Sequence, residues 1–192
     1  MHFIVIFGPP AVGKMSVGDE ITALTGIPVF HNHLSIEPIL KFFPFGSDPF
    51  IRLVDTFRRN MMTEVAQSDL PGIIFTFVWS FSVDEDAIFM ADLCQIFEDA
   101  GADITLIELK ADLDVRLIRN RTEKRLAEKP SKRDIAKSEK LLLEHEGEHQ
   151  LNSGGSIPLK HRHIIIDNTN RTAEDVATEV VDLLSLPRRP HL

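Results

Sequence analysis

The stretch that decides the fold of this chain is Gly8-Pro9-Pro10-Ala11-Val12-Gly13-Lys14-Met15-Ser16. It directly follows the apolar run 3–7, which predicts a buried strand, and it opens a helical pattern. A strand, a glycine-bounded loop and a lysine form the P-loop pattern. The backbone N–H groups of such a loop point inward as an anion nest, and the helix N-terminus adds partial positive charge. We therefore predict a phosphate site here, with Lys14 reaching the terminal phosphates.

One position departs from the usual pattern. Ser or Thr normally follows the lysine and holds Mg²⁺. Here Met15 follows Lys14, and the hydroxyl comes one place later, at Ser16. We expect Ser16 to coordinate Mg²⁺ or to bond a phosphate. The alternative is a glycine-rich turn with an exposed lysine.

Length and composition indicate one globular domain. The chain has 192 residues, and 43% hydrophobic with 26% charged content is ordinary for a globular protein. We expect a single domain at 1–186 and a frayed tail at 187–192. The chain enters a strand at once without a basic leader, no apolar run is long enough to span a bilayer, and Cys94 is the single cysteine. A cytoplasmic protein without a membrane partner is the expectation.

The charge of the chain is unevenly spread. The formal net charge is −8, yet the segment 116–133 carries eight basic and two acidic residues. A local basic segment on an acidic protein favours a small polyanionic ligand over nucleic acid. We therefore expect no nucleic-acid partner.

Strand and helix patterns alternate along the sequence. Strands are expected at 2–7, 29–30, 73–79, 104–109 and 163–166, with amphipathic helices between them. This order predicts an α/β fold: a five-stranded parallel sheet with helices on both faces and the ligand at the carboxyl ends of the strands. Two regions look peripheral: 34–70, on the acceptor side, and 128–160, a polar lid.

Four segments carry a resemblance to known enzymes. They are the P-loop, Thr25–Glu37 with its Gly26-Ile27-Pro28 turn, the arginine-rich stretch Arg116–Arg133, and Ile164–Asn170. Together they resemble the shikimate-kinase and nucleoside-monophosphate-kinase branch of P-loop proteins. Chloramphenicol phosphotransferase, gluconate kinase and zeta-toxin-like kinases are similar relatives.

The resemblance implies an ATP-dependent kinase that uses Mg²⁺ and phosphorylates a hydroxyl group of a small molecule, either a metabolite or an antibiotic. It implies that Asn168 lies in the loop that touches the adenine. It also has departures: His31 and His33 stand where shikimate kinases have aspartates, and the third strand ends Val78-Trp79-Ser80 without the usual glycines. The acceptor therefore stays open.

Several arginines are candidates for closing over the transferring phosphate. Guanidinium groups are forked donors that suit phosphate oxygens. We expect Arg119, Arg121, Arg125 and Arg133 to fill this role. Of these, Arg119 and Arg121 are expected to bind ATP. Arg121 and Arg125, four apart, are expected to share one helix face. The alternative is a solvated helix face.

The acceptor pocket is expected to contain His31, His33, Arg58 and Trp79. Alternation along a strand would put the two histidines on the same side of the sheet. One imidazole, by preference that of His33, would accept the proton of the hydroxyl. The alternative is polar lining without catalysis. Two interpretations of Arg58 are equally weighted. It binds a carboxylate in the acceptor pocket, or it is an exposed arginine.

One further motif needs weighing. His145-Glu146-Gly147-Glu148-His149 fits the zinc-protease pattern. That site needs a stable helix, which Gly147 is expected to interrupt. The leading prediction is therefore a kinase, monomeric or weakly dimeric. An ATP-binding regulator or ATPase without a small acceptor is the second, and a zinc hydrolase is the third.

Overall fold

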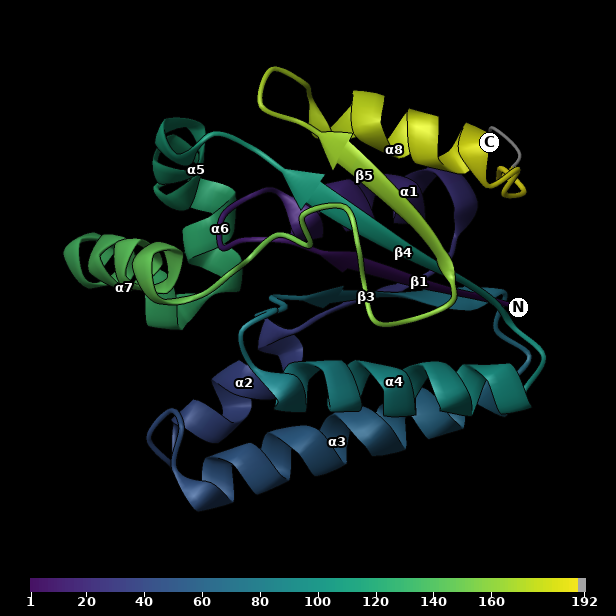
Figure 1. The fold of residues 1–192 in the computed structure, drawn as a ribbon, viewed down its shortest axis with the longest axis horizontal. Coiled ribbons are helices and arrows are strands. Elements are labelled where there is room, and N and C mark those ends of the chain that lie inside the picture. The colour runs from purple at the N-terminus through teal and green to yellow at the C-terminus, as the bar shows by residue number, and fades with distance from the viewer. Residues whose placement is uncertain (190–192) are drawn as a thin grey trace.

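The computed structural model describes residues 1–189, and they form one layered α/β unit (Figure 1). The strands are β1 (His2–Phe7), β2 (Val29–His31), β3 (Gly72–Phe77), β4 (Asp103–Lys110) and β5 (Arg162–Asp167). The helices are α1 (Lys14–Thr25), α2 (His33–Leu40), α3 (Asp48–Ala66), α4 (Asp84–Asp99), α5 (Leu113–Asn120), α6 (Glu123–Glu128), α7 (Ile135–Glu148) and α8 (Ala173–Leu183), with the 3-10 turn η1 (Pro130–Lys132).

The strands of the described chain form one parallel sheet in the order β2-β3-β1-β4-β5. The predicted α/β class and parallel five-stranded sheet are confirmed. In the register of the sheet, Phe7 lies opposite Phe77 on β3 and Glu108 on β4. The P-loop therefore leaves β1 between the carboxyl ends of two neighbouring strands, where parallel α/β sheets bind their ligands.

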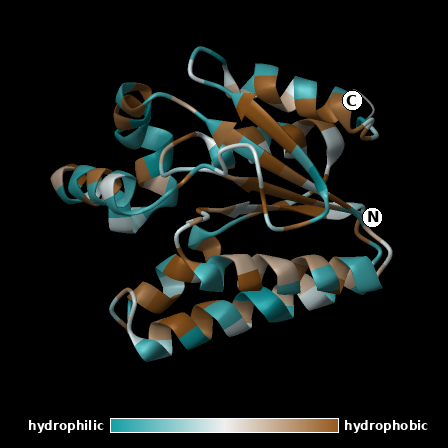
Figure 2. Cartoon of the chain, in the orientation of Figure 1, coloured by the Kyte–Doolittle hydropathy of each residue, from teal (hydrophilic) through white to brown (hydrophobic). Residues whose placement is uncertain are grey.

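Two apolar cores cover the two faces of the sheet. Alternate residues of β1 point to opposite faces, as strand geometry requires. Phe3 and Val5 pack with α3 and α4, whereas Ile4 and Ile6 pack with α1 and α8. Because both faces are covered, the central strands β1 and β3 are almost wholly apolar, whereas β4 and β5 also carry charged residues. Figure 2 shows brown along the strands and teal at the start of β5.

Residues 34–70 are largely helical. Pro38 lies inside α2, and α3 begins at Asp48 with Pro49 in its first turn. Strand β3 ends at Phe77 rather than Trp79. A third core cluster joins α2 and α3 through Ile36, Phe50 and Val54.

The lid region divides into two parts. Helices α5, α6 and α7 gather at the carboxyl end of the sheet (Figure 1). After α7, the chain turns back, and Ile157 and Leu159 pack against the core that faces α4. Residues 149–160 are therefore attached to the sheet rather than part of a free lid.

The end of the described chain is held by α1. The backbone N–H of Arg189 donates to the carbonyl of Leu24 at 2.8 Å, and Arg188 pairs with Asp182 at 2.8 Å. Fraying is therefore not seen for 187–189, and the remainder of the expected tail, 190–192, lies outside the described residues. Within residues 1–189, none of the helices combines the length and the apolar character that crossing a bilayer requires.

Candidate functional site

The P-loop is tightly wrapped around the side chain of Lys14. Its ammonium group donates to the carbonyls of Gly8 and Pro9 at 2.6 and 2.7 Å. Gly8 has φ 136°, and a Cβ there would lie 2.3 Å from the carbonyl oxygen of Leu109. Only glycine lets β1 turn into the loop against β4. Ala11 also has a positive φ, 61°, as nest-forming loops do.

Arg119 and Asn168 brace the loop from the side. The Arg119 guanidinium donates to the carbonyl of Val12 at 3.0 Å and to that of Asn168 at 2.7 Å. The Asn168 amide donates to the same Val12 carbonyl at 2.9 Å. Both predicted nucleotide-side residues thus lie beside Gly13, where α5 and the loop after β5 meet.

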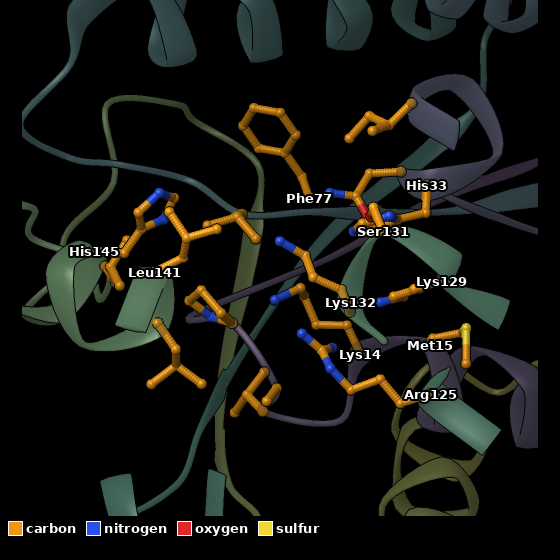
Figure 3. A pocket seen from close by; sticks show the side chains of 18 of the residues that line it. Lys14, Met15, His33, Phe77, Arg125, Lys129, Ser131, Lys132, Leu141 and His145 are labelled. Atoms are coloured by element: carbon orange, nitrogen blue, oxygen red, sulfur yellow. The ribbon is translucent and has the colours of Figure 1, made fainter. Parts of the chain in front are cut away.

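Four basic side chains converge in front of the loop, as Figure 3 shows. This cation cluster consists of Lys14, Arg125, Lys129 and Lys132. Within residues 1–189, no carboxylate lies within ion-pair distance of any of the four. Burial and the neighbouring cations Arg125 and Lys132 lower the pKa of Lys129 to about 7. Buried and partly buried like charges that lack ion-pair partners are stabilised by binding an anion.

Burial also lowers the pKa values of the other three cations of the cluster. The pKa of Lys14 is lowered well below its ordinary value, first by burial and then by the charge of Lys129. Burial lowers the pKa of Lys132, and that of Arg125 to about 10. Asn120, which is fully buried, accepts hydrogen bonds from Arg125 Nε at 3.0 Å and from Ser138 Oγ at 3.1 Å. This contact fixes the direction of the arginine.

Met15 and Ser16 both line the cavity in front of the loop. Met15 is 7% exposed. Among the described residues there is no group of three or more His, Cys, Asp or Glu side chains that could hold a metal ion. A divalent ion here would have one protein hydroxyl as ligand, that of Ser16, and would rely on water and phosphate oxygens.

His31 and His33 lie in different environments. Because β2 ends at His31 and α2 begins at His33, strand alternation does not relate them as expected. His31 is buried, with Nε2 at 3.9 Å from Glu128 and Nδ1 without a partner in the described chain. His33 lines the cavity, and its Nδ1 lies 2.7 Å from Glu37 Oε1. Only His33 is therefore brought to the cavity.

The carboxylate of Glu37 fixes the protonation of the His33 ring. A carboxylate only accepts, so Nδ1 carries the proton and Nε2 keeps its lone pair. Burial, and then the charges of Lys129 and Lys132, lower the pKa of His33 to about 2. The imidazole is neutral at neutral pH.

Arg58, a buried residue of α3, lines the cavity away from the loop. Its Nε donates to Ser35 Oγ at 2.9 Å, and a terminal nitrogen donates to the carbonyl of Asn32 at 3.4 Å. Neither partner is a carboxylate. The guanidinium carbon lies 5.9 Å from the ring centroids of Phe75 and Phe89, and burial lowers the pKa of Arg58 to about 10. The sequence alternative of an exposed arginine is wrong.

A single cavity of about 1210 Å³ joins the P-loop to this compartment. Its acceptor-side walls are mostly apolar, and they come from α2, α3, the end of β3, α4 and α7. The main wall residues are Ile36, Leu40, Phe45, Phe50, Val54, Phe77, Phe89, Leu141 and Leu142. The cavity therefore has a basic end at the loop and a mostly apolar end between α2, α3, α4 and α7.

Trp79 and Arg121 do not reach this cavity. Trp79 is fully buried and stacks on Phe81, with ring centroids 4.9 Å apart. It is a core residue because β3 ends before it and the chain turns inward. Arg121 follows the last residue of α5, and its exposed side chain pairs with Glu139 at 2.5 Å. The helix breaks before α6, so Arg121 and Arg125 do not share a face.

Two further sequence candidates are placed elsewhere. Arg133 is exposed, and its Nε donates to the carbonyl of Leu126 at 3.0 Å. The expected interruption at Gly147 is wrong, since α7 continues to Glu148. His149 follows the helix and its Nδ1 lies 3.1 Å from Ser80 Oγ. The two histidines of the zinc-like motif thus line the cavity without forming a metal site among the described residues.

The sequence reasoning missed the two lysines and Glu37. Lys129 and Lys132 flank Pro130-Ser131 in η1, a turn with no sequence period. The basic excess of 116–133 is a signal for them, but it does not distinguish inward from outward side chains. Glu37 ends the segment Thr25–Glu37, and no sequence pattern indicates that it bonds His33 and Ser131.

Comparison with solved structures gives matches along nearly the whole chain. A gluconokinase from Sinorhizobium meliloti 1021 is 17% identical with a TM-score of 0.60, covering 96% of this chain and 91% of that one. The Mycobacterium tuberculosis APS kinase, in complex with AMPPNP and APS, is 17% identical with a TM-score of 0.57, covering 96% and 97%. Shikimate kinase from Acinetobacter baumannii, in complex with shikimate, is 16% identical with a TM-score of 0.53, covering 96% and 93%.

No protein-family model matches this chain, and no curated protein matches it in sequence. Likeness at such identities reports on architecture alone. The parallel sheet, the loop after β1 and these structural matches together show that the chain has the P-loop kinase fold.

Proposed function

We propose that this protein is a phosphotransferase that moves the γ-phosphate of ATP to a hydroxyl group of a small molecule. The observation that carries the proposal is the cation cluster, which faces one end of the 1210 Å³ cavity without carboxylate partners in residues 1–189. Phosphoryl transfer depends on positioning and charge neutralisation, and this arrangement supplies both. The rest of the cavity leaves space for an acceptor.

ATP would bind with its phosphates in the loop. The loop amides and Lys14 would hold the β- and γ-phosphates, and Arg119 with Asn168 would flank the nucleoside side. The likeness to a kinase described with AMPPNP, an ATP analogue, supports a nucleotide ligand. Mg²⁺ would come with ATP. Ser16 fits it as a single hydroxyl ligand, and Mg²⁺ accepts such sites because it keeps most of its waters.

The acceptor would lie between the loop and Arg58. The apolar walls suit a molecule with a hydrophobic body, and Arg58, buried without a carboxylate among its hydrogen-bond partners, suits an anionic or oxygen-rich group at the far end. His33 would accept a hydrogen bond from the attacking hydroxyl at Nε2, because Glu37 occupies Nδ1.

The transfer would proceed in line between the two ends of the cavity. The acceptor oxygen forms its bond to the γ-phosphorus as the bond to the β–γ bridging oxygen breaks. Arg125, Lys129 and Lys132 would neutralise the charge on the transferring oxygens. The hydroxyl proton passes to His33 or, after transfer, to the product phosphate. A loose transition state needs little help from a base, so the low pKa of free His33 is tolerated.

The test is ADP release from MgATP with a panel of hydroxylated metabolites and antibiotics. We expect one acceptor class to raise ADP release well above the no-acceptor rate. Lys14→Ala should abolish this activity and weaken MgATP binding in calorimetry by at least tenfold. Lys160→Ala is the control, because Lys160 is exposed. Equal MgATP affinity in Lys14→Ala would remove the basis for the proposal.

A second candidate is an ATP-binding regulator or ATPase without a small acceptor. Met15 at the usual hydroxyl position favours it, since it weakens protein contact with the metal. The same panel separates the two functions. ADP release that no acceptor stimulates, together with intact MgATP binding, would favour this candidate.

A further inference from the structure

The carboxylate of Glu37 joins two parts of the protein that are 94 residues apart in sequence. Its Oε1 accepts from His33 at 2.7 Å and from Ser131 Oγ at 2.5 Å. Its Oε2 accepts from the backbone N–H of Ser131 at 3.1 Å. One side chain of α2 thus bonds both the histidine of the cavity and the η1 turn of the lid.

Ser131 is the centre of the turn that carries two of the four clustered cations. Lys129 precedes η1, and Lys132 is its last residue. The turn is closed by the N–H of Lys132, which donates to the carbonyl of Lys129 at 2.8 Å. In Figure 3, Ser131 lies beside His33, and the side chains of Lys129 and Lys132 lie near that of Lys14. Holding Ser131 therefore holds the backbone from which both lysine side chains enter the cavity.

The surroundings of Glu37 strengthen these contacts. The side chain of Glu37 is 18% exposed and that of His33 is 11% exposed, so water competes little for the contact between these two. Ser131 is exposed and makes two hydrogen bonds to the same carboxylate. The charged or titratable groups around Glu37 are Lys129, Lys132, His31 and His33. The two lysines attract its carboxylate. Without Glu37, Lys129 would keep the attraction of Asp19, whereas Lys132 would lose the carboxylate that attracts it.

We infer that Glu37 is a positioning residue that couples the lid turn to the cavity: it orients His33 through Nδ1 and holds Ser131, and thereby Lys129 and Lys132, in place. The role of this coupling in phosphoryl transfer rests on the proposed function, since it brings the hydroxyl acceptor and the lid cations together in one state. The coupling itself is a property of the structure and can be measured without an acceptor.

The first measurement is hydrogen exchange of the turn, in the free protein and with MgAMPPNP. Ser131→Ala should speed exchange of the amides at positions 131, 132 and 133 about tenfold, because the hydroxyl bond to the partly buried Glu37 carboxylate is lost. Ser82→Ala is the matched control: it removes the bond from Gln150 N–H to Ser82 Oγ, at 2.9 Å, beyond the other end of α7. It should change exchange only near Gln150.

The second measurement is the ¹⁵N NMR spectrum of the His33 ring, which distinguishes its tautomers. Wild type should have the proton on Nδ1. Glu37→Ala should move the ring toward the Nε2-protonated form. Glu37→Gln should keep the Nδ1 proton, because the amide oxygen still accepts, yet should loosen the turn, because its amide NH₂ cannot accept from Ser131 N–H. A purely structural role would not separate these effects.

Unchanged turn exchange in Ser131→Ala, or an unchanged His33 spectrum in Glu37→Ala with a folded protein, would overturn the inference. If Glu37→Ala does not fold, Glu37→Gln and Ser131→Ala decide it through the exchange of the turn. Failure of MgAMPPNP to bind wild type would count against the proposed function, while the measurements on the free protein would still decide the role of Glu37.

Discussion

At the scale of single residues, buried cations dominate the behaviour of the site. Lys129 is 8% exposed, and burial with the charges of Arg125 and Lys132 lowers its pKa to about 7. The side chain is therefore only partly charged at physiological pH. A bound polyphosphate would favour the charged form and raise this pKa. Proton uptake on nucleotide binding follows.

The first prediction concerns this proton. Below pH 7 Lys129 is charged before binding, whereas above pH 7 MgATP binding must draw a proton onto it. Affinity should fall as pH rises above 7, by up to about tenfold per pH unit, until the raised pKa of the complex is reached. Calorimetry at pH 8 in buffers of different ionisation enthalpy measures the uptake directly.

Lys129→Arg is the control for this effect, because a guanidinium stays charged. It should bind with less proton uptake and a flatter pH dependence than wild type. Lys132 has a pKa lowered by burial as well, so some dependence should remain. The same uptake in both proteins would exclude Lys129 as the group that titrates.

At the scale of elements, the break between α5 and α6 places Arg121 and Arg125 in different surroundings. Asn120 ends α5, Thr122 precedes α6, and Lys124 ties α6 to Asp19 of α1 at 2.7 Å. Because of this break, Arg125 points into the cavity, whereas Arg121 faces α7 and bonds Glu139 of that helix. Four-residue spacing does not align the two side chains when no single helix carries both.

The second prediction follows from this sorting. Arg125→Gln should weaken MgATP binding about tenfold or more, because it removes a partly buried positive charge from the cation cluster. Arg121→Gln should change it less than about twofold, since exposed ion pairs contribute little. Calorimetry on both variants measures the difference. A larger loss in Arg121→Gln would mean that the lid rearranges when nucleotide binds.

At the scale of the whole molecule, Glu108 connects the chain after α7 to the sheet. Its carboxylate is fully buried near the end of β4. It accepts from Asn152 at 2.8 Å, from the N–H of Ser153 at 3.0 Å and from the Ser153 hydroxyl, and it lies 3.1 Å from His163 Nε2. These donors lower the pKa of Glu108 despite its burial. The carboxylate thereby fixes the segment that closes the lid region.

The third prediction concerns this anchor. Glu108→Ala should lower the free energy of unfolding by about 3 kcal/mol, because several buried donors lose their acceptor. Urea unfolding measures it. Since the folded pKa is depressed, the stabilisation is full above the unfolded pKa and is lost as pH falls through the folded pKa. The difference in unfolding free energy between wild type and Glu108→Ala should therefore shrink in acid.

Glu98→Gln is the matched control for Glu108→Ala. Glu98 pairs with His161 at 3.3 Å, but its side chain is 46% exposed. The change should cost less than about 1 kcal/mol. Equal losses in the two variants would contradict the anchoring role of Glu108.

The sequence by itself determined the strand, loop and helix around Lys14 and the parallel sheet that carries them. Apolar runs, glycines and helical periods are local signals, because each depends on only about ten neighbouring residues. The loop that ends at Lys14 and the line of buried strands could therefore be predicted from the sequence. Arg58 could be named as an acceptor-side candidate, because it lies in a regular amphipathic helix.

Only the tertiary structure decided which side chains meet. Trp79 reads as a strand residue, but it enters the core because β3 ends two positions earlier. The contact of Glu37 with Ser131 depends on a turn that has no repeating pattern and on the path of the chain through two further strands. Charge and spacing mark residues that could bind phosphate, whereas the direction of each side chain depends on helix breaks and long-range packing.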